Sequence, residues 1–382
     1  MMRYDDSLII AQVGYVANVP YFLTYALMSK GFESINLLPE NILNSKFARI
    51  FYGSRYNGNP LNVRLIPIKG TGVAYIINLL NKLKYFSRKQ FLIAHLHIGS
   101  ALRDHLFLWF LEKLHKKKIK LAFEFHGTDL RNLSSLKAKL LRYIYNTFLV
   151  STPDLITYCE SLELPCMWLP NMVDPYYILF TKNNIENIIY NKKRNIDKDL
   201  TIKVLIPTRL DEHKNVQFFY EMLPEVVKDV DFNIQVTHIV WPETVDIFIS
   251  RVLPTYKLLT KNKNFKFKIL PLQNRYDLLS LYLNSNVVIG QFKLGILSLV
   301  ELEALATLNH VIMSRLNIRT RAVYSSEVPV CSIKDSSELG KCFDRIIREP
   351  ANLSGLEFIE RYHSIEKVIN MLLSYYYNVI HW

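Results

Sequence analysis

The sequence is poor in cysteine. It contains four cysteines in 382 residues, and none of them forms a C-x-x-C pair or stands near a cluster of histidines. This spacing gives no sign of a structural zinc site or a dithiol redox centre. We therefore expect Cys159, Cys166, Cys331 and Cys342 to be reduced core or surface thiols of a cytosolic protein.

Long hydrophobic runs are missing as well. The sequence contains no stretch of about 18 apolar residues, the length that a membrane-spanning helix needs. The apolar stretch near the start is too short for a signal peptide, and acidic residues precede it. These absences predict a cytoplasmic protein, and peripheral contact with the inner face of the cell membrane stays open.

Two common phosphate-binding loops are also absent. The sequence contains neither GxxxxGK[ST] nor GxGxxG. Their absence argues against P-loop ATPases and standard dinucleotide dehydrogenases, because those classes use these glycines to bring the backbone close to a phosphate.

Hydrophobic residues and positive charge are abundant. Half of the residues are hydrophobic, and 47 basic residues against 34 acidic ones give a net charge of +13. A chain of this length and composition is expected to form two domains with packed cores. The charge favours anionic partners such as nucleotides, phospholipid head groups or nucleic acid, and charge alone does not choose among them.

Strand and helix patterns alternate along most of the chain. Short apolar runs predict strands, and longer periodic runs predict helices. The strands are expected at 7–13, 92–97, 120–125, 155–159, 202–206, 232–240, 265–270, 287–290 and 310–313, and the helices at 18–30, from 99–100 to about 117, 216–227, 276–283, 299–306 and 355–379. Helix 18–30 is expected to end at Gly31. This alternation predicts an α/β fold with doubly wound parallel sheets.

One segment breaks the alternation. Residues 181–200 are rich in Asn and Lys without clear periodicity, which indicates a linker or surface insertion. We therefore expect an N-terminal domain at 1–175, a linker or insertion at 176–200 and a C-terminal domain at 201–354. A helix at 355–382 would follow.

The segment PTRLDEHKN (207–215) follows a predicted strand and precedes a predicted helix. In doubly wound sheets, ligands bind beyond the carboxyl ends of the strands. Arg209 and Lys214 would place two cations there beside a helix N-terminus, which suits a diphosphate. A solvated loop with ordinary surface charges is the alternative.

The segment GQFKLGILSLVELEALA (290–306) has the same strand–loop–helix pattern. Ser298 and Glu301 have the spacing of a capping box, which gives Glu301 a structural role. Glu303 faces another side of the helix, where its carboxylate could accept hydrogen bonds from ribose hydroxyls. A surface glutamate favoured by the helix dipole is the alternative.

A histidine and an aspartate stand in EFHGTDLR (124–131). His126 is expected at a strand's carboxyl end, where it could donate to a sugar hydroxyl or exchange a proton with it. Gly127 permits unusual backbone angles. A structural histidine remains the alternative, and Asp129 could cap the next helix instead of touching a ligand.

Three further signals are weaker. His95 and His97 share one face of a strand, but no third ligand stands near them in the sequence, so no zinc site is expected. The D-x-D pattern at 229–231 precedes a strand, and we interpret it as a turn. Lysines 116–118 follow an aromatic helical pattern that could lie on an anionic membrane, or they could form a solvated helix end.

Taken in order, five segments resemble the retaining GT-B glycosyltransferases of family 4. They are HGTDLR (126–131), LPNMVD (169–174), TRLDEHKN (208–215), LVELEALA (299–306) and the terminal 363–380. The resemblance implies two Rossmann-like domains facing a central cleft. The first domain would bind the acceptor and the second the nucleotide sugar, and the last helix would cross back onto the first domain.

The same resemblance implies roles for individual residues. Arg209 and Lys214 correspond to the family's diphosphate-binding pair, Glu303 to the second glutamate of its E-x7-E motif, and His126 to its active-site histidine. Gly295 stands where the motif has its first glutamate, which contacts the donor sugar. In its place, the backbone amides of Gly295, Ile296 and Leu297, next to Ser298, could approach the donor. Gly14 resembles the glycine of the family's N-terminal loop, and Asp129 and Asn171 are expected on the acceptor side.

The implied reaction is metal-free transfer of a hexosyl or related sugar. The donor would be a UDP- or GDP-linked sugar, with no further cofactor, and the acceptor a glycan or a lipid-linked molecule. Two alternatives remain. One is a catalytically inactive nucleotide- or glycan-binding protein, prompted by Gly295. The other is a nucleic-acid-binding protein, prompted by the charge, although the cations are scattered and no reader motif is present, so no nucleic-acid partner is expected.

Overall fold

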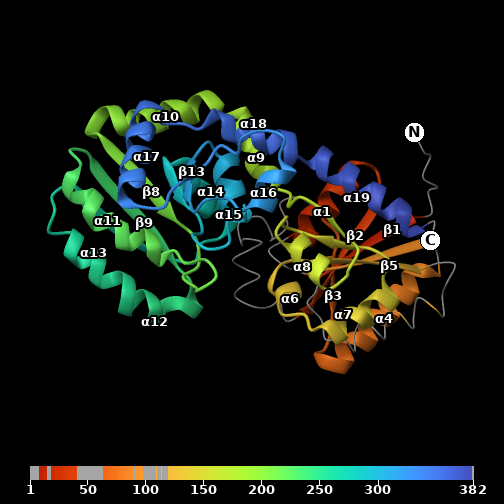
Figure 1. The fold of residues 1–382 in the computed structure, drawn as a ribbon. Helices are drawn as coiled ribbons and strands as arrows, with labels where there is room; N and C mark the ends of the chain where they lie inside the picture. Colours follow the sequence, from red (N-terminus) through yellow and green to blue (C-terminus); the bar gives the residue numbers. More distant parts are fainter. Residues whose placement is uncertain are drawn as a thin grey trace. The chain divides into compact units, whose positions relative to one another are not determined.

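The computed structural model describes residues 8–14, 19–40, 63–88, 91–97, 109, 113 and 119–380. The chain divides into two compact units. Unit 1 contains Met1–Met172 and Ile365–Trp382, and unit 2 contains Val173–Ser364. Figure 1 shows a parallel sheet flanked by helices in each unit. None of the described helices is long and apolar enough to cross a bilayer.

Unit 1 is built on a seven-stranded parallel sheet with the order β3-β2-β1-β4-β5-β6-β7. The strands are β1 (Leu8–Val13), β2 (Glu33–Pro39), β3 (Leu65–Ile68), β4 (Phe91–Leu96), β5 (Ile119–Phe125), β6 (Phe148–Val150) and β7 (Cys166–Trp168). The helices are α1 (Val19–Ser29), α4 (Gly72–Ser87), α6 (Thr128–Arg131), α7 (Ser135–Ile144), α8 (Leu155–Ser161) and α19 (Ile365–Ile380). Most apolar residues of β1, β2, β4, β5 and β6 are almost fully buried, as expected for strands covered on both faces.

The last helix of the chain, α19, belongs to unit 1. It packs against α1 and β5, and Figure 1 shows it in dark blue along this unit. The hydroxyls of two of its tyrosines form hydrogen bonds with residues that are distant in the sequence. The Tyr375 hydroxyl donates to the Thr147 carbonyl (3.0 Å), and Tyr376 contacts residues of β1 and β4. The helix expected at 355–382 is therefore two helices, of which the first, α18 (Leu353–Tyr362), belongs to unit 2.

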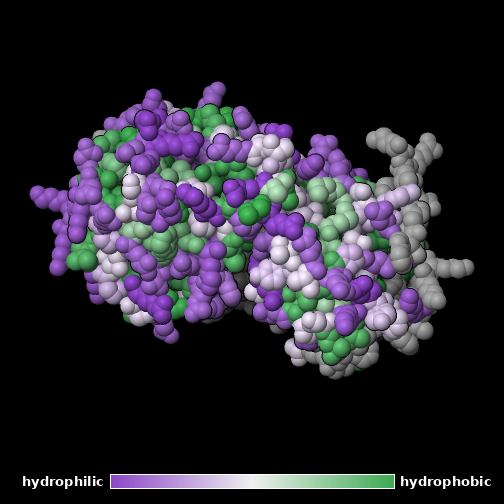
Figure 2. All heavy atoms as spheres, in the orientation of Figure 1, coloured by the Kyte–Doolittle hydropathy of each residue, from purple (hydrophilic) through white to green (hydrophobic). Residues whose placement is uncertain are grey.

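Unit 2 has a six-stranded parallel sheet with the order β10-β9-β8-β11-β12-β13. The strands are β8 (Thr201–Ile206), β9 (Asn233–Val240), β10 (Phe265–Pro271), β11 (Val287–Ile289), β12 (His310–Met313) and β13 (Cys331–Ser332). The helices besides α18 are α9 (Pro175–Asn183), α10 (Ile185–Asp199), α11 (Gln217–Asp229), α12 (Val245–Ile247), α13 (Leu253–Leu259), α14 (Arg275–Leu283), α15 (Leu299–Ala306), α16 (Ile318–Val323) and α17 (Ser336–Arg348). The face of this unit visible in Figure 2 is mostly hydrophilic, in keeping with amphipathic outer helices.

The strand–helix pattern predicted for unit 2 is confirmed. Strands β8 to β12 and helices α11, α14 and α15 lie within a residue or two of the predicted ranges. The capping box at the start of α15 is also present, because Glu301 accepts the Ser298 amide (2.8 Å). In unit 1, the chain turns at Gly31 (φ 85°) after α1, as its sequence position predicts.

The expected linker at 181–200 is instead helical. Helices α9 and α10 cover it, and α10 buries Ile188, Lys192 and Ile196 along one face. These residues are four apart, so they do form a stripe with helical period. A lysine at its centre makes the stripe hard to see in the sequence. The Lys192 ammonium is completely buried and donates to Asn309 Oδ1 (2.8 Å) and to the carbonyls of Tyr282 and Ser285.

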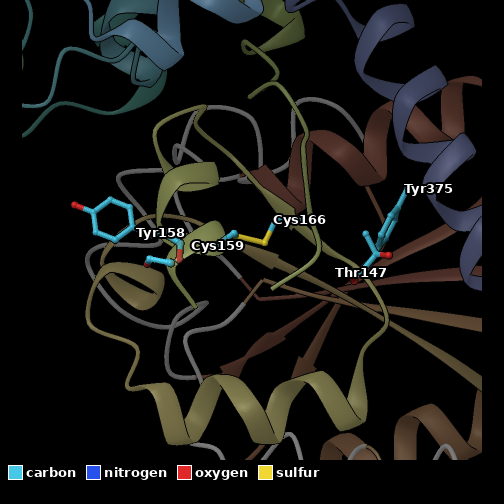
Figure 3. Close-up of a disulfide and its surroundings, with 6 residues drawn as sticks. Thr147, Tyr158, Cys159, Cys166 and Tyr375 are labelled. Atoms are coloured by element: carbon cyan, nitrogen blue, oxygen red, sulfur yellow. Dashed lines mark hydrogen bonds between the residues drawn. A yellow bond between two sulfur atoms is a disulfide. The ribbon is translucent and has the colours of Figure 1, made fainter. Parts of the chain in front are cut away.

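Two predictions near residue 160 are wrong. Residues 155–159, expected to form a strand, begin helix α8, since a five-residue apolar run does not distinguish a strand from one face of a short helix. Cys159 and Cys166, expected as reduced thiols, form a disulfide across a separation of seven residues. It joins α8 to β7 between Tyr158 and the Thr147–Tyr375 contact (Figure 3). Cys331 and Cys342 are free, as expected.

Candidate functional site

Residues 207–215 form the loop at the carboxyl end of β8. The Arg209 guanidinium donates through Nε to Asp211 Oδ2 (2.7 Å) and is half exposed. Asp211 also accepts the Lys214 amide through Oδ1 (2.8 Å). One carboxylate thus shapes the loop that presents the two predicted diphosphate-binding cations.

The second predicted donor loop, 290–298, follows β11 and lies directly beside this loop. β8 and β11 are neighbours in the sheet. The Thr208 hydroxyl donates to the Ile289 carbonyl (2.9 Å), and the Phe292 amide donates to the Lys214 carbonyl (2.7 Å). The structure therefore brings together the two loops that the sequence analysis singled out in unit 2.

Two buried side chains fix the shape of loop 290–298. Glu301 accepts the Gln291 amide through Oε1 (2.9 Å) and the Ser298 amide through Oε2 (2.8 Å). A Cβ on Gly290 would lie 2.6 Å from Glu301 Oε1, so a side chain here would displace the Glu301 carboxylate. The Gln291 side chain accepts the Leu294 amide (2.7 Å) and donates to the Ile296 carbonyl (2.8 Å).

Gly295 occupies a position that admits no side chain. Its φ of +62° is left-handed, and a Cβ there would lie 2.6 Å from the Arg315 carbonyl oxygen and 2.7 Å from the Asn317 nitrogen. The Asn317 amide donates to the Gly295 carbonyl (2.9 Å). A glutamate at this position would force the loop away from the 315–317 segment.

Three consecutive amides of this loop are left without partners. Gly295, Ile296 and Leu297 are buried, and none of their N–H groups donates a hydrogen bond within the described part of the chain. They stand just before Ser298, the N-cap of α15. Buried backbone donors are nearly always satisfied, and helix N-termini favour anions, so this loop is suited to bind an anionic group.

Glu303 lies in a buried ion-pair cluster of unit 2. Its Oε1 pairs with Arg275 Nη1 (2.7 Å), and the Tyr282 hydroxyl donates to its Oε2 (3.3 Å). The same guanidinium donates through Nη2 to Asp174 Oδ2 (2.9 Å) and lies 4.5 Å from the ring centre of Tyr177. Burial raises the pKa of Glu303, and Arg275 opposes that rise. Glu303 is only 2% exposed, so Arg275 holds the carboxylate in a fixed orientation.

In unit 1, His126 stands at the carboxyl end of β5, as predicted. The turn after it folds around the carboxylate of Asp129, which accepts the amides of His126 (3.0 Å) and Gly127 (2.7 Å). Gly127 has a φ of +136°, as its position in the motif suggested. Asp129 therefore has the backbone-capping function that the sequence analysis weighed against contact with an acceptor.

His126 belongs to a buried polar cluster. Its Nε2 lies 3.1 Å from His97 Nδ1, and the His97 Nε2–H donates to Gln12 Oε1 (2.6 Å). Glu124 is also close, because its Oε2 lies 3.3 Å from His97 Nδ1 and 3.7 Å from His95 Nε2. The expectation that no third metal-binding group stands near His95 and His97 is thus wrong.

Burial controls the ionisation of this cluster. It lowers the pKa of His95 and of His97 well below the usual range. It raises the pKa of Glu124 to about 7. Both histidines are therefore neutral at physiological pH.

Sequence reasoning missed Gln12, Glu124 and Tyr376 in unit 1. Gln12 Nε2 donates to the Tyr376 hydroxyl (2.9 Å), which lies 2.8 Å from His95 Nδ1. For Gln12 and Glu124 a signal exists, because each is a buried polar residue near the end of a mostly apolar strand. The remaining predicted residues are less informative. Gly14 (φ +128°) follows β1, and Asn171, in the segment after β7, is buried.

Known protein structures share this fold. A glycosyltransferase from Rickettsia africae aligns over 99% of this chain and 99% of its own, with a TM-score of 0.67 and 12% identity. Sucrose-phosphate synthase from Thermosynechococcus elongatus aligns over 98% and 99%, with a TM-score of 0.64 and 13% identity. HepE from Anabaena, solved with UDP and glucose, aligns over 97% and 100%, with a TM-score of 0.61 and 10% identity. No protein-family model and no curated sequence matches the chain.

Identity this low establishes a fold and leaves chemistry open. Each unit of this chain has its own parallel sheet with helices on both sides, and the likeness to the three proteins extends over nearly the full length of both partners. The chain therefore has the GT-B glycosyltransferase fold.

Proposed function

We propose that the chain is a retaining glycosyltransferase of the family 4 type, which transfers a sugar from a nucleotide-diphosphate sugar to a glycan or a lipid-linked acceptor. One observation carries the proposal. The three unpartnered amides of Gly295, Ile296 and Leu297 lie in the loop that is hydrogen-bonded to the Arg209–Lys214 loop. Backbone donors and two cations on adjacent loops match the charge and the hydrogen-bonding needs of a diphosphate.

The chemistry is electrostatic. As the glycosidic bond to the donor phosphate breaks, negative charge grows on the departing diphosphate, and Arg209, Lys214 and the free amides would stabilise it. These groups would perform the task that a divalent ion performs elsewhere, so no labile metal at the diphosphate is required. His126 would hydrogen-bond a sugar hydroxyl, and Glu303, oriented by Arg275, would accept hydrogen bonds from the ribose.

Nucleotide binding is the first test. Ligands that bind the native state raise its melting temperature, so UDP, GDP and their sugars are compared by thermal shift. HepE was solved with UDP, which makes uridine nucleotides the first choice. The proposal expects a shift with at least one nucleoside diphosphate and a weaker one with the monophosphate. The absence of any shift across the panel would refute it.

Donor turnover tests the roles of the cations. Arg209→Ala and Lys214→Ala are compared with Lys257→Ala, which removes an exposed lysine of α13 in the same unit. Loss of one anion-binding group typically costs about 10²–10³ in turnover. We expect such a loss in the first two variants, none in the third, and equal rates in Mg²⁺ and EDTA. Full activity of both variants, or dependence on added divalent ions, would contradict the proposal, and binding without donor hydrolysis would indicate an inactive binding protein.

For the acceptor we propose a molecule presented at an anionic membrane. Lys113 lies 5.6 Å from the ring centre of Trp109. Both residues precede the predicted basic run in the sequence, and lysines 116–118 of that run lie outside the described residues. Lys113 and Lys120 also border a cavity of about 540 Å³ with the exposed Tyr143. Cations beside aromatic rings favour an anionic lipid surface. Sedimentation with vesicles should increase with phosphatidylserine and decrease with salt, and binding independent of both would rule this out.

A further inference from the structure

The buried cluster of unit 1 combines the groups that bind transition metals. We infer that His95, His97 and Glu124 form a binding site for a zinc ion, with His95 Nε2, His97 Nδ1 and Glu124 Oε2 as ligands. These three atoms lie within 4.8 Å of one another, and no other such group occurs among the described residues. Two imidazoles and a carboxylate are a common set of protein ligands for zinc.

The distances agree with a single ion. Ligand bonds of about 2.0–2.1 Å in a tetrahedron place neighbouring ligand atoms about 3.3 Å apart. His97 Nδ1 lies 3.3 Å from Glu124 Oε2, and His95 Nε2 lies 3.7 Å from the same oxygen. His126 Nε2 lies 3.1 Å from His97 Nδ1 but outside this group, so a solvent molecule would complete the tetrahedron.

The hydrogen bonds around the cluster favour the same conclusion. A metal-bound histidine usually has a hydrogen-bond partner on its other ring nitrogen, which fixes the orientation of the ring. The far nitrogen of His97 donates to Gln12 Oε1 (2.6 Å), and the far nitrogen of His95 lies 2.8 Å from the Tyr376 hydroxyl. Both rings therefore turn their remaining nitrogen toward Glu124.

Two of the three atoms that face the proposed ion lack other partners among the described residues. His95 Nε2 and Glu124 Oε2 form no hydrogen bond with any described residue, although His95 is 0% and Glu124 1% exposed. A buried carboxylate oxygen without a partner is costly, and a cation between it and the imidazoles would remove that cost. Because the ligands are buried, the ion would be structural: it would join the carboxyl ends of β4 and β5 and hold His126 in place.

Metal content tests this inference without any activity assay. The full chain is produced without a histidine tag and dialysed against EDTA, and its zinc is then measured by mass spectrometry. We expect about one zinc ion per chain, released when guanidinium unfolds the protein in the presence of a chromogenic chelator. A metal-free chain whose melting temperature does not rise with added Zn²⁺ would overturn the inference and would point to a protonated, hydrogen-bonded Glu124.

Variants identify the ligands. His95→Gln and Glu124→Gln should lose at least about 90% of the bound zinc, because each removes one of three ligands. His238→Gln is the matched control, since His238 is equally buried but belongs to unit 2 and to no such group. Zinc retained in Glu124→Gln, or lost in His238→Gln, would exclude this site.

Two further measurements test the site even if the ligand variants do not fold. Tyr376→Phe leaves all ligands in place and removes the hydroxyl beside His95, so zinc affinity should fall about 10–100-fold. The wild-type chain with Co²⁺ in place of zinc should give the intense visible absorption of four-coordinate cobalt. Unchanged affinity in Tyr376→Phe together with a weak six-coordinate spectrum would refute the proposed geometry.

Discussion

The backbone at Gly295 yields a quantitative prediction about the donor loop. Two separate penalties oppose a side chain at this position. The φ of +62° places the residue in the left-handed region, and the missing Cβ would overlap the Arg315 carbonyl oxygen at 2.6 Å and the Asn317 nitrogen at 2.7 Å. Both contacting atoms belong to the backbone, so they cannot move aside as the end of a flexible side chain could.

The magnitude follows from adding the two penalties. A left-handed conformation costs an L-residue about 1–2 kcal/mol, and overpacking costs about 1–3 kcal/mol. Gly295→Ala should therefore lower the free energy of unfolding by about 2–5 kcal/mol. For a unit of this size that corresponds to a decrease in melting temperature of about 4–20 °C. Gly295→Glu, which introduces a longer side chain at the same position, should destabilise at least as much.

Two other glycines separate the penalties. Gly31 has a φ of +85° but no atom within 4 Å of its Cβ position, so Gly31→Ala isolates the conformational cost of about 1–2 kcal/mol. Gly340 lies inside α17 with open space around its Cβ position. Gly340→Ala should therefore raise the free energy of unfolding by about 0.5–1 kcal/mol. The assay is chemical denaturation of all three alanine variants. If Gly295→Ala costs no more than Gly31→Ala, the argument from close packing is wrong.

Three other substitutions test buried polar groups of unit 2. Lys192→Met removes the donor shared by three oxygen acceptors, of which the Tyr282 carbonyl keeps the Asn309 side-chain amide, and should destabilise by about 2–4 kcal/mol in urea denaturation. Glu303→Gln removes one of the two carboxylates that pair with Arg275, so it should lower stability by about 3 kcal/mol. It should also raise the KM for the donor, because Glu303 is proposed to bind the ribose. An unchanged KM would exclude that contact. Burial lowers the pKa of His238 to about 3. Below about pH 6.5 this histidine is therefore protonated in the unfolded chain but not in the folded one. Its contribution to the free energy of unfolding then falls by about 1.4 kcal/mol per pH unit, down to about pH 3. His238→Gln should reduce the slope by that contribution and leave the pH dependence above pH 7 unchanged, as measured by urea denaturation over a pH series.

Sequence patterns could predict strands β8 to β12 and helices α11, α14 and α15 of unit 2 because their local signals agree with one another. The strands are apolar runs or alternate apolar with polar residues, the loops after β8 and β11 carry polar residues, and the Ser298–Glu301 pair marks the start of α15. Each of these features depends on residues close together in the chain, where periodicity and capping chemistry operate.

The errors come from features whose partners are distant or whose pattern is short. Lys192 interrupts an apolar stripe, and only its acceptors near 282–309 explain why a lysine is buried there. The disulfide between Cys159 and Cys166 depends on the approach of α8 and β7, which spacing does not reveal. Similarly, the position of Glu303 in the helix was predictable, but its partner Arg275, 28 residues earlier, was not.

Polar residues near the ends of buried strands offer a way to find such clusters. A strand covered on both faces is expected to be apolar throughout, so Gln12, His95 and Glu124 depart from the rule on β1, β4 and β5. These strands are adjacent in the sheet, and their carboxyl ends lie at one edge. A buried polar side chain must find a partner, so departures on adjacent strands predict one shared cluster. The order of the strands must be known before that prediction can be made. Tyr376 lies 364 residues from Gln12 and enters the cluster only because α19 returns to unit 1.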